Sequence, residues 1–262
     1  MKNINLKFKS LGALSSYIAN NSACGFFSDQ VLASEMTNNV KFYGSKNFEA
    51  ANNMMLQGWS EGAARVQKYM NAGATATAPK RVIYNSVVGF APNVPNYLSG
   101  NPLNMINQKR VKTPKKVVSI VYNCAVGYDI KAANIEKAAA ALFNVVSGLE
   151  ASGVRVELWC ANFSYKDDEQ INFALKIKSA GQPFNLLKMI YPIVHPSFNR
   201  RHCFAVTERA GVENDWGEYG QILLSVDKSI KACQALRIPS DNVFSYYDLT
   251  GKTESEIAKM IK

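Results

Sequence analysis

The sequence predicts an α/β fold in residues 114–262, with a mostly parallel sheet flanked by helices and one antiparallel hairpin, and an α+β elaboration in residues 1–113. One observation is that an apolar run, a long helical repeat and a second apolar run follow one another between residues 117 and 160, as in a strand–helix–strand unit. Another is that 47% of the 262 residues are hydrophobic, although no stretch reaches the roughly 18 apolar residues of a membrane span. The turn-rich residues 85–116 separate the two parts.

The second part begins with a buried strand at residues 117–122, where the apolar run is continuous and bounded by charges. Asp129 is the expected cap of the next helix, in which apolar residues recur at helical spacing over 135–149. Ser152-Gly153 ends this helix, and residues 154–160 form the next strand.

The rest of the second part alternates strands and helices. Residues 171–177 alternate apolar and polar side chains, which predicts an edge strand, antiparallel to its neighbour and joined to it by the acidic turn 166–169. Thr253 and Glu256 are spaced as a capping box for the last helix. Between them the pattern predicts a helix at 184–192, strands at 203–207, 222–226 and 243–247, and a helix from its cap Asp227 to Leu236.

The first part predicts a strand at residues 4–8 and a helix at 11–20. Asn47 or Ser45 can cap a helix that Gly58 ends, after which Trp59 docks on the core. We expect this part to pack onto the C-terminal sheet. The remaining predicted elements are a helix at 60–70, a loop at 73–79 and turns at 89–102.

The net charge of +10 belongs to the first part of the chain. Residues 1–116 hold 14 Lys or Arg and four acids, whereas residues 117–262 hold 16 of each kind. A basic cluster suits a phosphate backbone or an acidic protein face, and the alternative is a solvated linker. Pro114 favours an extended connector over a helix. The candidate polyanion site is the densest cluster: Lys109, Arg110, Lys112, Lys115 and Lys116.

Several function classes are disfavoured by what the sequence lacks. The five cysteines are scattered without a CxxC pair, which argues for a reducing compartment. The first residues lack the apolar region of a secretory signal. Neither a glycine-rich phosphate loop nor a pair of catalytic carboxylates is present. We expect a cytoplasmic protein without a cofactor and without membrane contact, and a virion component is the alternative.

The predicted order of strands and helices, with an antiparallel hairpin after the first helix, resembles the von Willebrand factor A (vWA) domain, within the broader Rossmann-like class. In that family the first strand ends in Asp-x-Ser-x-Ser, which helps to hold a divalent metal. Residues 123–127 here read Asn-Cys-Ala-Val-Gly, so an amide replaces the carboxylate and both hydroxyls are lost. Because hard cations need oxygen ligands, the resemblance implies a degenerate domain without the metal.

A second resemblance covers most of the chain. The segments GWSEGAARV, VPNYLSGNPLNM, ELWC and HPSFNRRHCFAVTE look like an uncharacterised family of phage-encoded proteins with a vWA-like C-terminal half. This resemblance implies a phage origin, and no activity comes with it.

The two histidines of the chain lie close together, within residues 195–209. His195, His202 and Cys203 lack a fourth ligand for zinc, and Cys203 sits at the start of an apolar run, where cysteines are usually inert. Arg200 and Arg201 can bind a phosphate or a carboxylate, or the segment can simply turn the chain after a helix. The candidate partner or ligand loop consists of Asn123, Asp129, His195, Arg200, Arg201 and His202.

Three function hypotheses follow. The first is a non-enzymatic interaction protein that docks a protein partner through the metal-less vWA-like domain. The second is nucleic-acid binding through the basic first part and its connector, which must weaken with salt. The third is an enzyme acting on a nucleotide or a phosphorylated small molecule at the carboxyl ends of the strands, near Asn123, Asp129 and the 195–209 segment.

Overall fold

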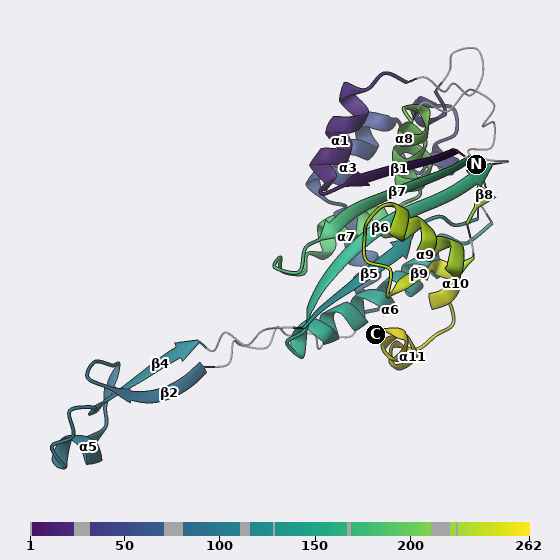
Figure 1. The fold of residues 1–262 in the computed structure, drawn as a ribbon. Coiled ribbons are helices and arrows are strands. Elements are labelled where there is room, and N and C mark those ends of the chain that lie inside the picture. The colour runs from purple at the N-terminus through teal and green to yellow at the C-terminus, as the bar shows by residue number, and fades with distance from the viewer. Residues whose placement is uncertain are drawn as a thin grey trace.

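The computed structural model describes residues 2–23, 32–70, 81–110, 116–127, 129–166, 169–210, 221–223 and 225–262. Its centre is a six-stranded sheet in the order β1-β7-β6-β5-β9, with β8 paired to β6 (Figure 1). β5 is parallel to β6 and β9, β1 is parallel to β7, and β6 is antiparallel to β7 and β8. The predicted α/β fold is therefore confirmed. The strands are β1 (Lys2–Phe8), β5 (Val117–Asn123), β6 (Arg155–Lys166), β7 (Glu169–Lys178), β8 (Gln221–Ile222) and β9 (Val243–Ser245).

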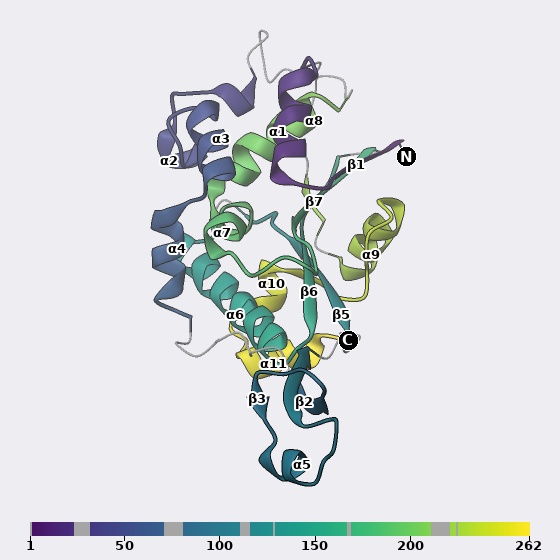
Figure 2. The same ribbon diagram turned by 90° about the vertical axis from the view of Figure 1, so that its left-hand side faces the viewer.

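Helices cover both faces of this sheet. Figure 2 shows the sheet nearly edge-on, with α6 and α7 on one side and α9 on the other. A short 3₁₀ turn, η1 (Ala33–Glu35), and a π-helix, η2 (Phe198–Cys203), complete the body. The helices of the body are α1 (Leu11–Asn20), α2 (Val40–Tyr43), α3 (Phe48–Gln57), α4 (Ser60–Gln67), α6 (Ala132–Ala151), α7 (Leu186–Val194), α8 (Phe204–Glu208), α9 (Val226–Ala235), α10 (Tyr246–Leu249) and α11 (Glu254–Met260).

The core has one layer on each face of the sheet, because side chains along a strand point alternately to opposite faces. On β5, Ile120 and Tyr122 belong to the large cluster shared with α6 and α7. Val121, between them, belongs to a smaller cluster with Ala232 and Cys233 of α9. A strand buried on both faces reads as a continuous apolar run, which is why the predicted strand over 117–122 is confirmed.

The start of the chain is part of the same sheet. β1 pairs with β7 over its whole length, with Lys2 opposite Glu169 and Phe8 opposite Leu175. The expectation that residues 171–177 form an edge strand is therefore wrong, because β1 covers that edge, although the strand is antiparallel to β6 as predicted. The boundary at residue 113 stays a prediction.

The helix starts and stops of the first part agree with the sequence. Asn47 caps α3, since its Oδ1 accepts a hydrogen bond from the backbone N–H of Ala50 at 2.8 Å. Gly58 ends that helix with φ at 106°, which favours glycine. α1 and the capping box of Thr253 and Glu256 are also confirmed, whereas α4 stops at Gln67. The predicted loop 73–79 and Asp167 and Asp168 of the acidic turn lie outside the described residues.

Five predictions in the second part are corrected. Residues 203–207 are helical in η2 and α8, because a short buried apolar run does not distinguish a helix from a strand. The strand at 222–226 is limited to β8, and Ser225 rather than Asp227 caps α9. Lys131 stands at the start of α6, so Asp129 is not its cap. The last predicted strand divides into β9 and α10.

Residues 81–110, which we call the arm, form a second and smaller sheet. The strands β2 (Arg81–Ser86), β4 (Met105–Arg110) and β3 (Ala91–Pro92) are antiparallel in the order β2-β4-β3. A short helix, α5 (Val94–Leu98), lies between β3 and β4 in the sequence. Figure 1 shows the arm apart from the body. Residues 89–102, which were predicted to form turns, thus contain β3 and α5. The strands β2 and β4 were not predicted.

We expect the body to keep its stability without the arm. Arg81 lies opposite Arg110 across β2 and β4, so a short Gly-Asn turn can replace residues 82–109. Because no side chain of the replaced segment is buried, the Tm should stay within about 2 °C of that of the full chain. Differential scanning calorimetry of both proteins measures this. A fall of roughly 8 °C or more would mean that the arm supports the body.

Candidate functional site

The arm displays large apolar side chains that no described residue covers. None of the side chains at residues 82–109 is buried, and Leu98 and Phe90 are 78% and 64% exposed. Thirty residues are too few to enclose a core of their own, and apolar patches on this scale usually mark an interaction surface. The large exposed apolar residues of the arm are Val82, Ile83, Tyr84, Val87, Val88, Phe90, Val94, Tyr97, Leu98 and Leu103.

Asparagine side chains hold the end of the arm in shape in place of a core. The amide of Asn107 donates to the carbonyl of Val88, and that of Asn96 donates to the carbonyl of Leu103, both at 2.9 Å. Asn93 caps α5 by accepting from the N–H of Asn96 at 3.3 Å. These bonds fix the turns and leave the apolar side chains free for contact.

A close backbone approach also fixes this end. The N–H of Phe90 donates to the carbonyl of Ile106 at 2.9 Å. A Cβ at Gly89 would come within 2.1 Å of that carbonyl oxygen, so only glycine fits there.

The base of the arm is basic. No Asp or Glu occurs from residue 62 to residue 128, a stretch that holds nine Lys and Arg. Lys109 and Arg110 belong to β4 and not to the connector, because their backbone pairs with β2, and the Nζ of Lys109 lies 5.5 Å from the ring centroid of Tyr84. Lys116 is exposed just before β5. Lys112 and Lys115 lie outside the described residues, so of the five side chains of the candidate polyanion site the structure describes those of Lys109 and Lys116.

The 195–209 segment is a buried structural hub. Arg201 has no exposed surface, and it donates four hydrogen bonds to residues 34–45 of the first part. Its Nη1 donates to the carbonyl of Ser34 at 2.8 Å, and its Nε donates to the hydroxyl of Ser45 at 2.7 Å. Its guanidinium also lies 4.6 Å from the ring centroid of Tyr43. A partner could not reach Arg201 without opening this interface.

Neighbouring side chains extend the same attachment. Arg200 donates to the carbonyl of Phe42 at 2.6 Å, and Ser197 donates to that of Tyr43 at 2.6 Å. The carboxylate of Glu208 accepts from the N–H of Ser34 at 2.9 Å. Farther along, Arg209 donates to the carbonyl of Ile18 at 2.8 Å. The segment thus fastens Ile18 and residues 34–45 to the body.

Both histidines are buried among aromatic rings. His195 is stacked on Tyr191 at 4.9 Å and meets the edge of Trp59 at 4.4 Å. Burial and the nearby charge of Arg65 lower the pKa of His195 to about 4. His202 has no exposed surface, and burial lowers its pKa to about 3. Both rings are therefore neutral near pH 7, and His195 ends α7, as the structural interpretation of this segment expected.

A pocket of about 300 Å³ lies where β5 ends. It brings His195 and Arg200 together with the loop that follows β5. Asn123, the last residue of β5, is buried, and its side-chain amide hydrogen-bonds to the backbone. Nδ2 donates to the carbonyl of Leu223 at 3.3 Å, and Oδ1 accepts from the N–H of Ala125 at 3.2 Å. Asp129 is exposed beside the pocket's loop. Of the six residues of the candidate loop, two line this pocket.

The residues at 123–127 do not fit the divalent metal of the vWA family. The amide oxygen of Asn123 is held by the backbone, and the cysteine, alanine and glycine that follow offer no oxygen side chain. In the described ranges no three His, Cys, Asp or Glu side chains are placed to hold a metal ion. No helix among those ranges is long and apolar enough to cross a bilayer.

One thiol faces the pocket at the end of β5. The neighbouring Cys160 and Cys203 side chains lower the pKa of the Cys124 thiol to about 5, and Cys124 lines the pocket. A nucleophilic cysteine also needs a base within hydrogen-bond reach. Among the described residues no cysteine hydrogen-bonds a histidine ring, and Cys160 donates to the carbonyl of Pro192. No local pattern indicates that these three cysteines lie together, because they are far apart in the sequence.

We expect replacement of Arg201 to be costly. An Arg201→Met variant leaves three carbonyls and one hydroxyl without their donor in a buried interface. The free energy of unfolding should fall by about 3 kcal/mol, and the Tm should fall by about 6–12 °C. Calorimetry with Arg155→Met as the matched control, an exposed arginine, tests this. Equal Tm values for the two variants would contradict the structural role.

The buried histidines should make stability depend on pH. In the unfolded chain both take up a proton as the pH falls below about 6.5, whereas in the folded chain their pKa values lie at about 4 and 3. The stability present above pH 6.5 is therefore lost as the pH falls toward 4, by at most about 1.4 kcal/mol per pH unit for each histidine. Urea unfolding at pH 7, 6 and 5 measures the slope. The double variant His195→Asn, His202→Phe should flatten it, and an unchanged slope would refute the assignment.

Comparison with known proteins gives the family and no activity. The model of a domain of unknown function, DUF7192, matches residues 2–249. No curated protein and no solved structure matches the chain. The match begins in β1 and ends in α10, so it covers both parts of the chain and the arm. The chain therefore belongs to the DUF7192 family.

Proposed function

We propose that this protein is a non-enzymatic interaction protein that docks a protein partner, and that the arm carries the docking surface. The observation behind the proposal is the set of large apolar side chains that residues 82–109 expose without burying one. Clustered aromatic and aliphatic residues are the usual energetic centre of a protein interface. The asparagine bonds that hold the end of the arm keep these side chains in one arrangement before binding, which lowers the entropic cost of association.

The charge of the arm indicates the chemistry of the partner. Residues 81–110 carry three cations and no acid. We expect a partner with an apolar groove that accepts the end of the arm, and with acidic groups that face the basic base of the arm. Such charge pairs raise the association rate and suppress wrong partners more than they raise affinity.

The vWA-like and phage origins belong to this proposal. The order β7-β6-β5-β9 supports the vWA likeness, because β6 and β9 flank β5 in parallel and β7 follows β6 antiparallel. Docking of partners by a metal-less domain is in keeping with the internal use of the Asn123 amide. The cytoplasm, of the host for a phage protein, is the proposed location.

Nucleic-acid binding is the second candidate, supported by the acid-free stretch that contains the arm. The arm offers aromatic rings on which bases could stack, at Tyr84, Phe90 and Tyr97. Most of its exposed apolar residues are Val, Ile or Leu, which have no ring to stack on a base. This composition favours a protein partner.

The docking proposal is tested by changing the end of the arm. A triple variant, Phe90→Ser, Tyr97→Ser, Leu98→Ser, should lose the captured partner by about tenfold or more, because each buried apolar anchor of an interface contributes at least 1–2 kcal/mol. The measurement is quantitative capture from nuclease-treated extract, followed by the affinity of the purified partner. The control, Val40→Ser, Leu187→Ser, Val226→Ser, removes three exposed apolar residues from the body. Equal capture by both variants would contradict the proposal.

The alternative is tested by fluorescence anisotropy with a random single strand and a random duplex at several salt concentrations. A variant with the five cations of residues 109–116 neutralised is measured beside the wild type. Under the docking proposal, binding at 150 mM salt is negligible for both. Binding that falls steeply with salt and vanishes in the variant would establish the nucleic-acid function instead.

A further inference from the structure

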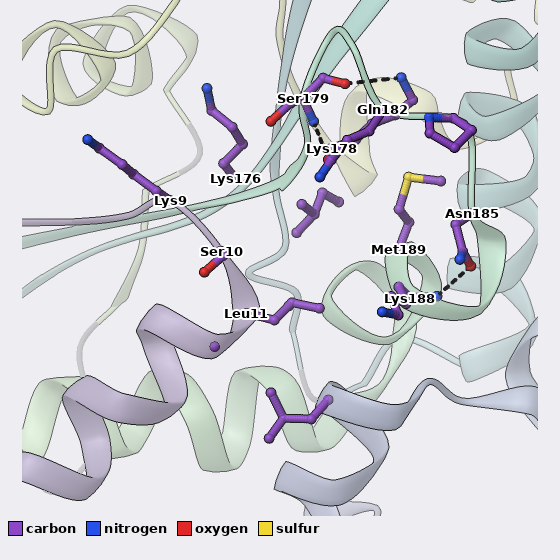
Figure 3. A pocket seen from close by; sticks show the side chains of 14 residues that line it. Lys9, Ser10, Leu11, Lys176, Lys178, Ser179, Gln182, Asn185, Lys188 and Met189 are labelled. Atoms are coloured by element: carbon purple, nitrogen blue, oxygen red, sulfur yellow. Dashed lines mark hydrogen bonds between the residues drawn. The ribbon is translucent and has the colours of Figure 1, made fainter.

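A hollow of about 430 Å³ lies where β1 and β7 end and α1 and α7 begin (Figure 3). Two of the four lysines that line it pair with glutamates of β6 and α6. Of the other two, Lys9 lies near Ser10 on one side of the hollow, whereas Lys188 lies near Asn185 on the other side. Because these side chains do not converge, the hollow gives a small ligand no focused set of contacts. The arm, in contrast, presents a row of backbone groups.

β2 is an edge strand over its whole length. In the order β2-β4-β3 it pairs with β4 over all six residues from Arg81 to Ser86, and its other side meets no described strand. Its apolar residues are of the kinds that favour strands, and Val82, Ile83 and Tyr84 are all exposed. An uncovered edge of this kind is a template for a further strand.

The hydrogen bonds of β4 show which backbone groups of β2 are free. The carbonyl of Ile106 accepts a hydrogen bond at 2.9 Å from a backbone N–H just before β3, so Ile106 directs its backbone away from β2. Successive residues of a strand direct these groups to opposite sides. Asn107 therefore faces β2, where it lies opposite Tyr84. The N–H and C=O groups of Ile83 and Asn85, on either side of Tyr84, consequently point to the free edge.

The opposite edge of the same sheet is closed. β3 consists of only Ala91 and Pro92, and proline has no N–H to donate. Short edge strands, prolines and lysines are among the features by which proteins prevent strands from pairing at a sheet edge. β2 contains neither a proline nor a lysine. The arm thus blocks one edge of its sheet and leaves the other edge open.

The charge of the arm decides between a second copy of this chain and a different partner. Residues 81–110 carry three cations and no acid, and the exposed Lys109 lies opposite Val82 near the base of the arm. Two copies that paired through β2 would bring these like charges together, which is unfavourable. A segment with acidic residues at its ends would attract them.

We propose that the partner of the arm adds a strand to the free edge of β2, through an extended segment in which apolar side chains alternate and the ends are acidic. This inference rests on the proposed function and specifies how the arm binds. The N–H and C=O groups of Ile83 and Asn85 bond to the added strand, and these main-chain bonds supply affinity. The side chains of the added strand lie alternately on the two faces of the sheet, beside Val82 and Tyr84 on one face and beside Ile83 on the other.

The experiment is an NMR titration of the amide groups of the full chain with a peptide in which valine and threonine alternate, flanked by glutamates at both ends. The N–H signals of Ile83 and Asn85 should shift, and their hydrogen exchange should slow by about tenfold or more because they gain acceptors. The N–H of Tyr84, which is already bonded to β4, should keep its exchange rate. No response of Ile83 and Asn85 would overturn the proposal.

A second peptide, with lysines in place of the glutamates, tests the charge of the partner. It should bind about tenfold more weakly than the acidic peptide at low salt, because it repels the cations of the arm. Equal binding of the two peptides would overturn the requirement for acidic ends.

The variants Ile83→Pro and Ile83→Thr are a matched pair. Both remove the isoleucine side chain, but proline also removes the N–H and places its ring on the free edge, where a strand tolerates it. The proline variant should bind the acidic peptide about tenfold more weakly or worse, whereas the threonine variant should stay within about threefold of the wild type. Slow exchange of the Tyr84 N–H in the proline variant shows that β2 still pairs with β4. Equal binding by the two variants would overturn the proposal.

The partner purified by capture separates this inference from the docking proposal. If the triple variant of the arm loses the partner and Ile83→Pro keeps it, docking through the arm holds and strand addition is refuted. If the triple variant keeps the partner, the docking proposal is refuted, and the peptide titration decides on the edge of β2. Sedimentation of the free chain tests the remaining occupant: a dimer that Ile83→Pro dissociates would place a second copy on this edge and overturn the proposal.

Discussion

A single buried guanidinium holds the two parts of the chain together. Arg201 stays charged in the protein interior, so every donor it carries needs an acceptor there, and residues 34–45 supply four of them. To reach them the chain is helical from Phe198 to Glu208, with the arginines turned toward the first part. The pairing of β1 with β7 joins the same two parts at the sheet edge. The first and second parts are thus built into one body.

That body closes its core on both faces of the sheet without help from residues 81–110. We therefore expect the arm to contribute little to the stability of the body. A surface stabilised by amide hydrogen bonds and not by packing can vary its apolar residues without endangering the fold. Under the docking proposal, binding depends on residues of the arm, whereas the stability of the body depends on the sheet and the 195–209 segment.

Local patterns in the sequence predicted what depends on local physics. The strand–helix–strand unit over 117–160 and the caps at Asn47 and Thr253 follow from periodicity and spacing. The pairing of β1 with β7 joins residues more than 150 positions apart, which no local pattern records. Arg201 was predicted to be a candidate ligand-binding residue. The groups of residues 34–45 that accept its hydrogen bonds are distant in the sequence, so the sequence did not reveal its structural role. β2 and β4 were missed because strands without a buried face lack the apolar pattern that identifies a strand.

Site-specific photo-crosslinking can show whether the end of the arm contacts a protein partner. A photoreactive phenylalanine analogue at Tyr97 in the arm is compared with the same analogue at Tyr247, an exposed tyrosine of the body, in cells that produce the partner. A discrete protein adduct is expected from position 97 and none from position 247. Adducts from position 247 alone, or from neither position, would refute docking through the arm.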